Sequence, residues 1–343
     1  MKKRSSWLSI GVLLLFLFLA ACSSSSEETG NTSDEGNSDQ GEKAETVVLR
    51  LAENQPDNNP VTIAMYEFAD LVEEKTNGEV KIEVYANGQL GEETANIDQV
   101  QAGALDMARV NSVPVAQIVD EIGVFTTPFI FADQEHKYRV LDGEIGEEVL
   151  AKFEDHGMVS FGYLEAGTRN FYTTDKPIES VEDMKGLRIR VQPSDISVKM
   201  VQLLGAVPTP MDYGEVFTAL QTGVIDGAEN DFVSYYTSGH FEAAPHYTLN
   251  GHLSPPALVI MNKQTWDGLS EEHQLAIKES AAIAIEAQRE SMNEMQEEFR
   301  KEVEEAGSVI YEVDVEEFQE AINPIFDEMP QYEELIERIR ALQ

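Results

Sequence analysis

Cationic side chains are scarce in this chain of 343 residues, which has 24 Lys and Arg against 63 Asp and Glu and a formal net charge of −39. Nucleic-acid binding needs basic patches that displace counterions, so the composition argues against that function. It also disfavours docking on anionic lipid and favours solubility in a charged exterior. An anionic ligand would need a local cationic pocket, because salt screens distant charges beyond about 8 Å.

Cysteine, clustered histidine and cofactor motifs are also lacking. The single cysteine, Cys22, excludes an intramolecular disulfide and a multi-thiolate metal site. His240, His246 and His252 recur every six residues, which fits no familiar zinc spacing, so we expect all six histidines, among them His136, to be ordinary surface or loop residues. H-E-x-x-H, G-x-S-x-G, G-x-G-x-x-G and Walker A motifs are absent. We therefore expect no metal, no cofactor and no enzymatic activity.

The N-terminus has the pattern of an export signal. Residues 2–4 are basic and residues 7–20 are apolar, a run too short for a membrane span of roughly 20 residues. Residues 19–22, Leu-Ala-Ala-Cys, resemble a bacterial lipobox. We expect a lipoprotein signal peptide at 1–21 and a lipid on Cys22 that anchors the protein on the extracytoplasmic face of the cell membrane. The alternative is an ordinary signal peptide with a chance cysteine.

Residues 22–45 are mostly Ser, Glu, Gly, Asn and Asp, a composition that cannot bury enough apolar surface to fold. We expect a disordered acidic tether between the membrane and the folded part. About 300 residues remain, enough for two domains with sizeable cores.

The folded part begins with alternating strand and helix patterns. Strands are predicted at 47–51, 80–85 and 105–110, and helices at 62–75 and 92–102, which is a βαβ arrangement with right-handed crossovers. A second set follows, with strands at 158–164, 188–191 and 224–228 and helices at 197–204 and 214–222.

The last third of the chain is predicted to be mostly helical. Ser270 is a plausible N-cap, and no Pro or internal Gly follows it before Gly307. A helix of that length would extend about 55 Å at roughly 1.5 Å per residue, more than one small domain needs, so it could cross both domains. A strand is predicted at 309–313, and helix at 315–342 with a break near Pro324.

Three polar side chains stand out between residues 167 and 230. Arg190 ends an alternating strand-like run, and a planar guanidinium there suits a bidentate grip on a carboxylate. Arg169 is either a second cation of that site or a partner in a surface salt bridge. Asn230 follows a predicted strand, where ligands bind in open α/β sheets, although a turn cap is equally plausible.

Several long motifs resemble one family. Residues 181–191 read VEDMKGLRIRV and residues 214–230 read GEVFTALQTGVIDGAEN, with GQLG at 88–91 and QAGALD at 101–106. In this order they resemble the DctP family of solute-binding proteins of TRAP (tripartite ATP-independent periplasmic) transporters, over about residues 46–343. The family is not enzymatic: its members feed a sodium-coupled membrane permease.

The resemblance implies an α/β, two-domain periplasmic-binding-protein-like fold with a ligand cleft, crossing hinge strands and a long helix that spans both domains. Domain I would contain 46–168 and 256–295, and domain II would contain 169–255 and 296–343. The resemblance also implies a ligand site made of the clamp Arg190, the second arginine Arg169, the cleft residue Asn230, and three contacts from the first domain, Asn54, Glu93 and Asn111.

The ligand implied is a small carboxylate. Residues 229–232, 234–236 and 239–242 look like those of members that bind hexuronates such as glucuronate or galacturonate, although many of these carry Asn where this chain has Asp231. One carboxylate needs one arginine fork, and hydroxyl groups need Asn, Glu and Tyr partners. The alternatives are a C4-dicarboxylate ligand, or a sensor co-receptor or extracellular enzyme on the same scaffold.

Overall fold

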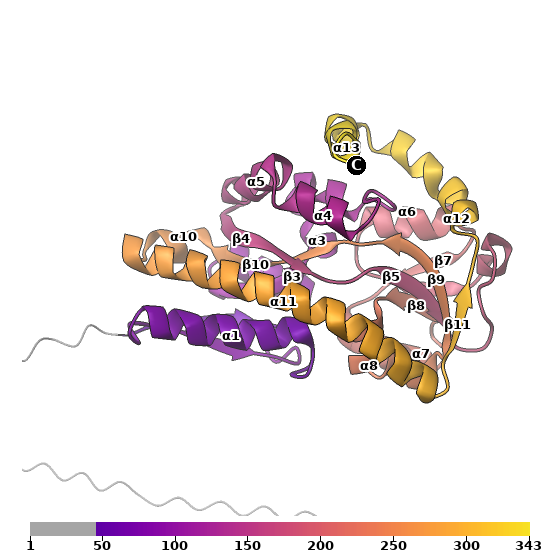
Figure 1. The fold of residues 1–343 in the computed structure, drawn as a ribbon, viewed down its shortest axis with the longest axis horizontal. Helices are drawn as coiled ribbons and strands as arrows, with labels where there is room; N and C mark the ends of the chain where they lie inside the picture. Colours follow the sequence, from indigo (N-terminus) through magenta and orange to yellow (C-terminus); the bar gives the residue numbers. More distant parts are fainter. Residues whose placement is uncertain (1–45) are drawn as a thin grey trace, which may run out of the picture. The chain divides into compact units, whose positions relative to one another are not determined.

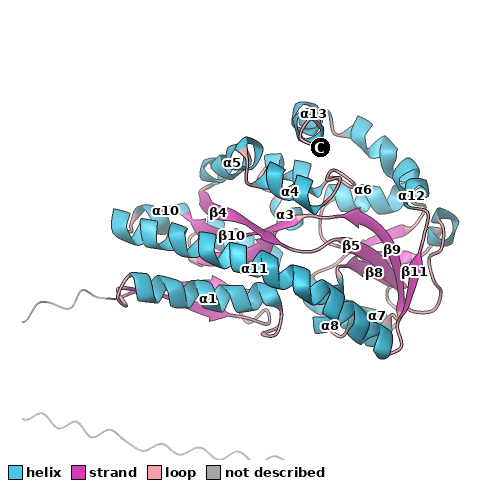
Figure 2. Ribbon diagram, in the orientation of Figure 1, coloured by secondary structure: helices cyan, strands magenta, loops and turns pink. Residues whose placement is uncertain are grey.

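A computed structural model describes residues 46–343 of the chain. The expected signal peptide, the lipidated Cys22 and the tether up to residue 45 lie outside the described residues. Within 46–343, no helix is long and apolar enough to cross a membrane. The described part is a mixed α/β fold with two sheets and helices on both sides of them (Figures 1 and 2).

The first sheet has the strand order β2-β1-β3-β10-β4. Strands β1 (Val47–Ala52), β2 (Val80–Tyr85) and β3 (Met107–Asn111) run parallel and are joined by α1 (Pro60–Lys75) and α2 (Glu93–Gln101), which confirms the predicted βαβ pattern. Strand β10 (Pro256–Asn262) lies antiparallel between β3 and β4 (Met158–Glu165).

The second sheet has the order β11-β9-β5-β8-β6-β7. Its strands are β5 (Arg169–Thr173), β6 (Arg188–Val191), β7 (Val207–Pro210), β8 (Gly227–Asn230), β9 (His246–Leu253) and β11 (Val309–Glu312). Strand β6 runs parallel to β7 and β8, whereas β5 runs antiparallel to β8 and β9. The carboxyl ends of β6 and β8 and the start of β5 therefore meet at one edge.

Two strand connections pass from one sheet to the other, β4 to β5 and β9 to β10. In the first, Gly167 adopts a φ of 75°, a left-handed conformation that suits glycine. The third connection is α11 (Glu271–Glu305), whose 35 residues give a length of about 52 Å. It packs against α1 and β4 at one end and against α8 (Phe232–Thr237) at the other (Figure 1). The expected N-cap is present, because the Ser270 hydroxyl accepts from the backbone N–H of His273.

The remaining helices are shorter than α11. They are α3 (Ser112–Val115), α4 (Gln134–Leu141), α5 (Glu144–Ala151), α6 (Asp195–Leu203), α7 (Val216–Gln221), α9 (His240–Ala243), α10 (Lys263–Asp267), α12 (Val315–Ile322) and α13 (Glu333–Arg340). Short 3₁₀ turns cover Asp120–Thr126, Lys152–His156, Val181–Met184, Tyr213–Glu215, Asn323–Glu328 and Pro330–Tyr332. Helix α13 lies against α4: the backbone oxygen of Ile339 in α13 is 2.8 Å from Nε2 of His136 in α4.

Two sequence predictions of secondary structure need correction. The strand predicted at 224–228 is β8 at 227–230, because Gly223 ends α7 with a φ of 68° and the chain turns before it pairs. The helix predicted at 214–222 begins as a 3₁₀ turn. The predicted break near Pro324 is confirmed, because α12 ends at Ile322, Pro324 cannot supply a backbone N–H, and the chain continues as 3₁₀ turns before α13.

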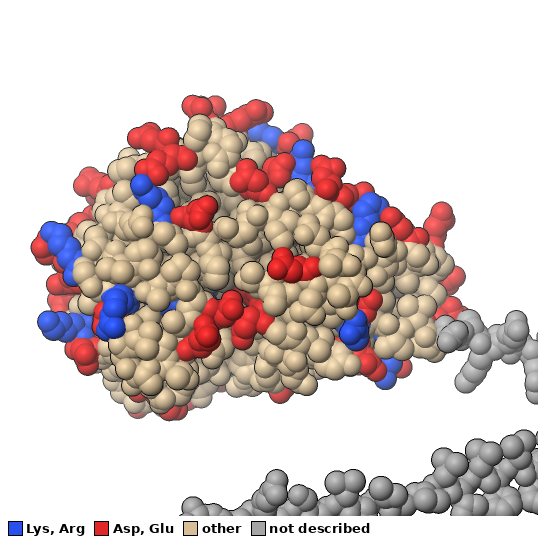
Figure 3. Space-filling view, turned by 180° about the vertical axis from the view of Figure 1, so that it is seen from behind, with Lys and Arg blue, Asp and Glu red and all other residues tan. Residues whose placement is uncertain are grey.

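Acidic side chains are spread over the surface, and basic side chains between them are few (Figure 3). One of three apolar clusters extends beneath both sheets. Its side chains come from β3 and β4 of the first sheet, from β6 of the second, and from the C-terminal helices α12 and α13. This cluster packs against strands of both sheets, and a polar cavity lies between the facing edges of the two sheets.

Candidate ligand-binding site

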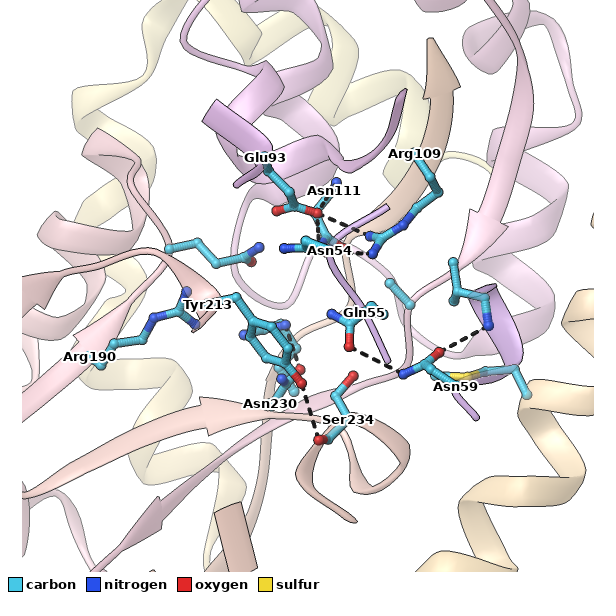
Figure 4. Close-up of a pocket in the computed structure, with 15 residues that line it drawn as sticks. Asn54, Gln55, Asn59, Glu93, Arg109, Asn111, Arg190, Tyr213, Asn230 and Ser234 are labelled. Carbon is cyan, nitrogen blue, oxygen red and sulfur yellow. Dashed lines mark hydrogen bonds and ion pairs between the residues drawn. The ribbon is translucent and has the colours of Figure 1, made fainter. Parts of the chain in front are cut away.

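A polar cavity brings the two sheets' polar edges together (Figure 4). All six residues expected at the site line this cavity, three from each of the two predicted domains. Nine further residues complete the lining. The whole set is Asn54, Gln55, Asn59, Val61, Glu93, Arg109, Asn111, Ala166, Arg169, Arg190, Gln192, Tyr213, Asn230, Ser234 and Met292.

Arg190 presents an unused fork to the cavity. Its Nε and Nη2 donate to the backbone oxygen of Met211 at 2.9 and 2.8 Å, which fixes the plane of the guanidinium. A guanidinium has five N–H donors, so three remain on Nη1 and Nη2. Within residues 46–343, no carboxylate forms a salt bridge with Arg190, although the side chain is buried. Burial lowers the pKa of Arg190 from its ordinary value, and the more distant Glu229 offsets this in part.

Arg169 is held by a carboxylate of its own sheet. Its Nε donates to Glu229 Oε2, and Nη2 donates to Oε1 of the same residue at 2.8 Å and to its backbone oxygen at 2.7 Å. Nη1 donates to Asn230 Oδ1 at 2.7 Å. Burial opposes the charge of Arg169, but the Glu229 carboxylate outweighs it and raises the pKa of the guanidinium. Arg169 is thus neutralised and has one N–H left for a ligand.

The expected contacts of the first domain are joined by a residue that the sequence did not single out, Arg109. Its Nη2 donates to Asn54 Oδ1 at 2.8 Å, and its Nη1 donates to Glu93 Oε1 at 3.0 Å. The same Glu93 oxygen accepts from the backbone N–H and the side-chain amide of Asn111, at 3.0 and 2.8 Å. Glu53 grips the other side of Arg109 through both carboxylate oxygens.

Local structure explains why these side chains meet. Glu53 and Asn54 directly follow β1, and Asn111 is the last residue of the parallel neighbour β3, so all three lie at one sheet edge. Glu93 is the first residue of α2, whose N-terminus faces that edge. Arg109 gave no sequence signal, because it lies within the buried strand β3 and its neighbours in the chain are apolar.

The cavity also contains amide and hydroxyl groups that were not predicted. Gln192 follows β6, and its Oε1 is buried without a partner among the described residues. Tyr213 donates its hydroxyl to the backbone oxygen of Ser234 at 3.3 Å. Asn59 caps α1 and also donates to Thr237 Oγ1 at 3.3 Å, a contact between α1 and α8. These groups can supply donors and acceptors to a ligand that carries hydroxyls.

The expectation of surface or loop histidines is wrong for three residues. His136, His240 and His252 are all buried. His240 Nδ1 lies 2.7 Å from the hydroxyl of Tyr172, and His252 stacks on Phe171 with ring centroids 4.1 Å apart. Their role is core packing that the sequence spacing could not reveal. Within residues 46–343, no group of three or more His, Cys, Asp and Glu side chains could hold a metal ion.

Burial controls the protonation of His240. Desolvation lowers the pKa of this imidazole to about 3, and the nearby positive charges of Arg190 and Arg169 act in the same direction. The neutral ring shares a hydrogen bond with the hydroxyl of Tyr172. His240 therefore adds no positive charge to the wall that holds the two arginines.

Comparison with known proteins identifies relatives along nearly the whole described part. The model of bacterial extracellular solute-binding protein, family 7 (DctP), matches residues 51–333. A solved structure of a TRAP periplasmic solute-binding protein from Xanthobacter autotrophicus Py2 with bound β-D-galacturonate is 40% identical. It covers 86% of this chain and 100% of its own, with a TM-score of 0.84.

Two further relatives differ in their ligands. A TRAP periplasmic solute-binding protein from Roseobacter denitrificans, solved with bound β-D-glucuronate, is 38% identical, covers 86% of this chain and 100% of its own, and has a TM-score of 0.84. The C4-dicarboxylate-binding periplasmic protein DctP of Rhodobacter capsulatus is 31% identical over 83% of this chain and 87% of its own length.

Proposed function

We propose that this chain, which belongs to the DctP family of bacterial extracellular solute-binding proteins (family 7), binds a hexuronate and delivers it to the sodium-coupled membrane permease of a TRAP transporter. The family is one of transport proteins and not of enzymes. The proposed ligands are glucuronate and galacturonate, the acids bound in two of the structures most similar to this one.

The observation that carries the proposal is the fork of Arg190. A buried guanidinium without a carboxylate partner is costly, and a ligand carboxylate would offset that cost. Its free Nη1 and Nη2 donors suit two parallel hydrogen bonds to one carboxylate. Asn230, Arg169 and the first-domain group of Asn54, Glu93 and Asn111 would then contact the rest of the ligand.

A C4-dicarboxylate is the second candidate ligand, and the relative from Rhodobacter capsulatus supports it. A thermal-shift screen of sugar acids and dicarboxylates separates the two. The protein used is residues 46–343, the part that the structure describes. We expect glucuronate or galacturonate to raise Tm more than succinate does, and titration calorimetry to give one site without turnover. A larger shift with succinate would make the dicarboxylate the ligand.

We also propose that the two sheets close on the ligand as two domains. Domain I takes 46–168 and 256–295, and domain II takes 169–255 and 296–343. The boundaries at 168 and 255 coincide with the two strand connections between the sheets. Helix α13 is an exception within 296–343: it contacts α4 and α5 of domain I, for example through Arg338 and Glu148 at 2.8 Å, so we propose that it moves with domain I.

A lipid on Cys22 remains a proposal that rests on the lipobox-like residues 19–22. A Cys22→Ala variant expressed in the native host should incorporate no labelled fatty acid and should appear uncleaved or in the wrong cell fraction. Deletion of residues 23–43 should not change ligand affinity, since they precede the part that the structure describes. Equal fatty-acid labelling of the Cys22→Ala variant and the wild type would exclude this anchor.

A further inference from the structure

One wall of the cavity carries an excess of negative charge. Arg109 is bonded by two carboxylates, those of Glu53 and Glu93, and all three side chains are buried. Glu53 uses both of its oxygens, whereas Glu93 contacts Arg109 through Oε1 alone. One guanidinium offsets only one of two carboxylates. Burial raises the pKa of the Glu93 carboxyl, and Arg109 and Asn111 oppose this. In its ionised form the less strongly paired Glu93 faces the cavity with a charge that the wall does not balance.

The two oxygens of Glu93 differ in their hydrogen bonds. Oε1 accepts three, from Arg109 and from the backbone and side chain of Asn111. Oε2 has no hydrogen-bond partner among residues 46–343, and the residue lines the cavity. Figure 4 shows Glu93 beside Asn111 and Asn54 at the edge of the cavity. Oε2 is therefore an acceptor available to a ligand.

The other wall offers a cation to the ligand. Arg169 is balanced by Glu229, while Arg190 has no carboxylate partner among the described residues. The cavity thus has one unbalanced cation and one unbalanced anion, contributed by different sheets. A ligand with one carboxylate satisfies the cation and still needs a hydrogen-bond donor for Glu93.

We propose that Glu93 determines specificity by admitting ligands with one carboxylate and rejecting those with two. The inference rests on the proposed function, in which a ligand carboxylate binds Arg190. A hydroxyl of such a ligand donates to Oε2 of Glu93. A second carboxylate cannot donate, and it meets a like charge in a buried site where screening is weak. The class admitted is the monocarboxylic sugar acids, and the class rejected is the aldaric acids and C4-dicarboxylates.

Titration calorimetry with D-glucuronate and D-glucarate tests this inference, because glucarate has a second carboxylate at C1 of the same carbon chain. Glu93→Gln keeps the size of the side chain and removes its charge. The matched control is Glu67→Gln, which removes the same charge from an exposed position of α1 in the same half of the molecule. The ratio of the two Kd values is compared between proteins, so the different shapes of the ligands cancel.

We expect wild type to prefer glucuronate, Glu93→Gln to lower that preference at least tenfold, and Glu67→Gln to leave it unchanged. A second measurement needs no variant. The monoamide of glucaric acid has the shape of the dianion and only one charge, so wild type should bind it at least tenfold more tightly than glucarate.

Each contrary result has a distinct meaning. A preference that survives in Glu93→Gln, or a monoamide that binds no better than glucarate, overturns the role of Glu93 and leaves the hexuronate proposal intact. A wild type that binds succinate and no sugar acid overturns both. If Glu93→Gln does not fold, the monoamide comparison in wild type decides alone.

Discussion

Arg169 at the start of β5 and Glu229 in the adjacent strand β8 form a buried ion pair in which the guanidinium donates to both carboxylate oxygens. The pair stands directly beside Asn230, whose Oδ1 also accepts from Arg169. The second arginine of the site is thus oriented by its own sheet. Its charge is already balanced before any ligand binds.

The Arg169–Glu229 pair should make the fold acid-labile. Burial would raise the pKa of Glu229, but Arg169 and His252 outweigh it and lower the pKa from 4.5 to about 2. A lowered folded-state pKa contributes stability above pH 4.5 that is lost as the pH falls towards 2, on the order of 3 kcal/mol. Urea unfolding between pH 6 and 2.5 measures it.

The same pair predicts the effect of Glu229→Gln. This substitution leaves Arg169 buried without its counter-ion, which should cost about 3–5 kcal/mol at pH 7 and flatten the acid dependence of stability. Glu67→Gln is the control and should change neither quantity. A Glu229→Gln protein with wild-type stability would show that the pair contributes nothing net.

Arg190→Ala should cost ligand affinity about 2–5 kcal/mol, because the ligand carboxylate is left buried without its partner. That is roughly 30-fold to several thousandfold in Kd. Arg190→Lys keeps the charge and loses the planar fork, so its ligand affinity should lie between those of the wild type and Arg190→Ala. Calorimetric titration with the best ligand measures all three proteins. If Arg190→Lys bound the ligand as tightly as the wild type, Arg190 would act only as a point charge.

The matched control for Arg190 is Arg188→Ala on the same strand. Arg188 is exposed and paired with Asp226 at 2.5 Å, away from the cavity lining. We expect unchanged ligand affinity and a loss of stability of at most about 1 kcal/mol. Arg169→Ala should cost less affinity than Arg190→Ala, because Arg169 has one N–H left for a ligand whereas Arg190 has three.

Ligand binding should make the protein more compact. A ligand that contacts both sheets stabilises the closed form by its differential affinity for that form. The hydrogen bond between Asn59 of α1 and Thr237 of α8 joins the two halves and should form on closure. Small-angle scattering with and without the best ligand should give a smaller radius of gyration when bound. An unchanged profile at saturation would argue against closure.

Gly167→Ala should hinder closure at the connection between β4 and β5. A Cβ there would lie 2.4 Å from Cβ of Asp231 and 2.6 Å from Nε2 of Gln296. Gly186→Ala is a close control, because its φ of 77° resembles the 75° of Gly167 and nothing lies within 4 Å of its Cβ. Both should lose roughly 1–2 kcal/mol of stability from backbone strain.

Only Gly167→Ala should also weaken ligand binding, since its added contacts are steric and lie beside the cavity. Chemical denaturation and calorimetry measure the two effects separately. Equal affinity in both glycine variants would mean that Asp231 and Gln296 adjust without cost.

His240 should remain neutral in acid. Its folded-state pKa of about 3 lies below the ordinary 6.5, so its contribution to stability is present above pH 6.5 and is lost as the pH falls towards 3. Histidine NMR signals followed from pH 8 to 4.5 should include one that does not titrate. A His240→Gln variant should lack that signal, and a signal that titrates near 6.5 would contradict the prediction.

The sequence by itself determined the elements whose pattern is local. The βαβ start, the strand from 188 to 191 and the helix beginning after Ser270 followed from periodicity and capping, and α11 was predicted to within one residue at each end. The family motifs placed Arg190, Arg169 and Asn230 in one site, and the structure brings all three to one cavity.

Only the tertiary structure decided what each charge does. Arg190 and Arg169 look alike in sequence, yet one meets a backbone oxygen and the other meets Glu229 on a neighbouring strand 60 positions away. Arg109 was not predicted because its partners come from β1 and α2 and have no fixed spacing from it. Pairing between buried charges depends on which strands are neighbours, and strand order is set by long-range packing rather than by local pattern.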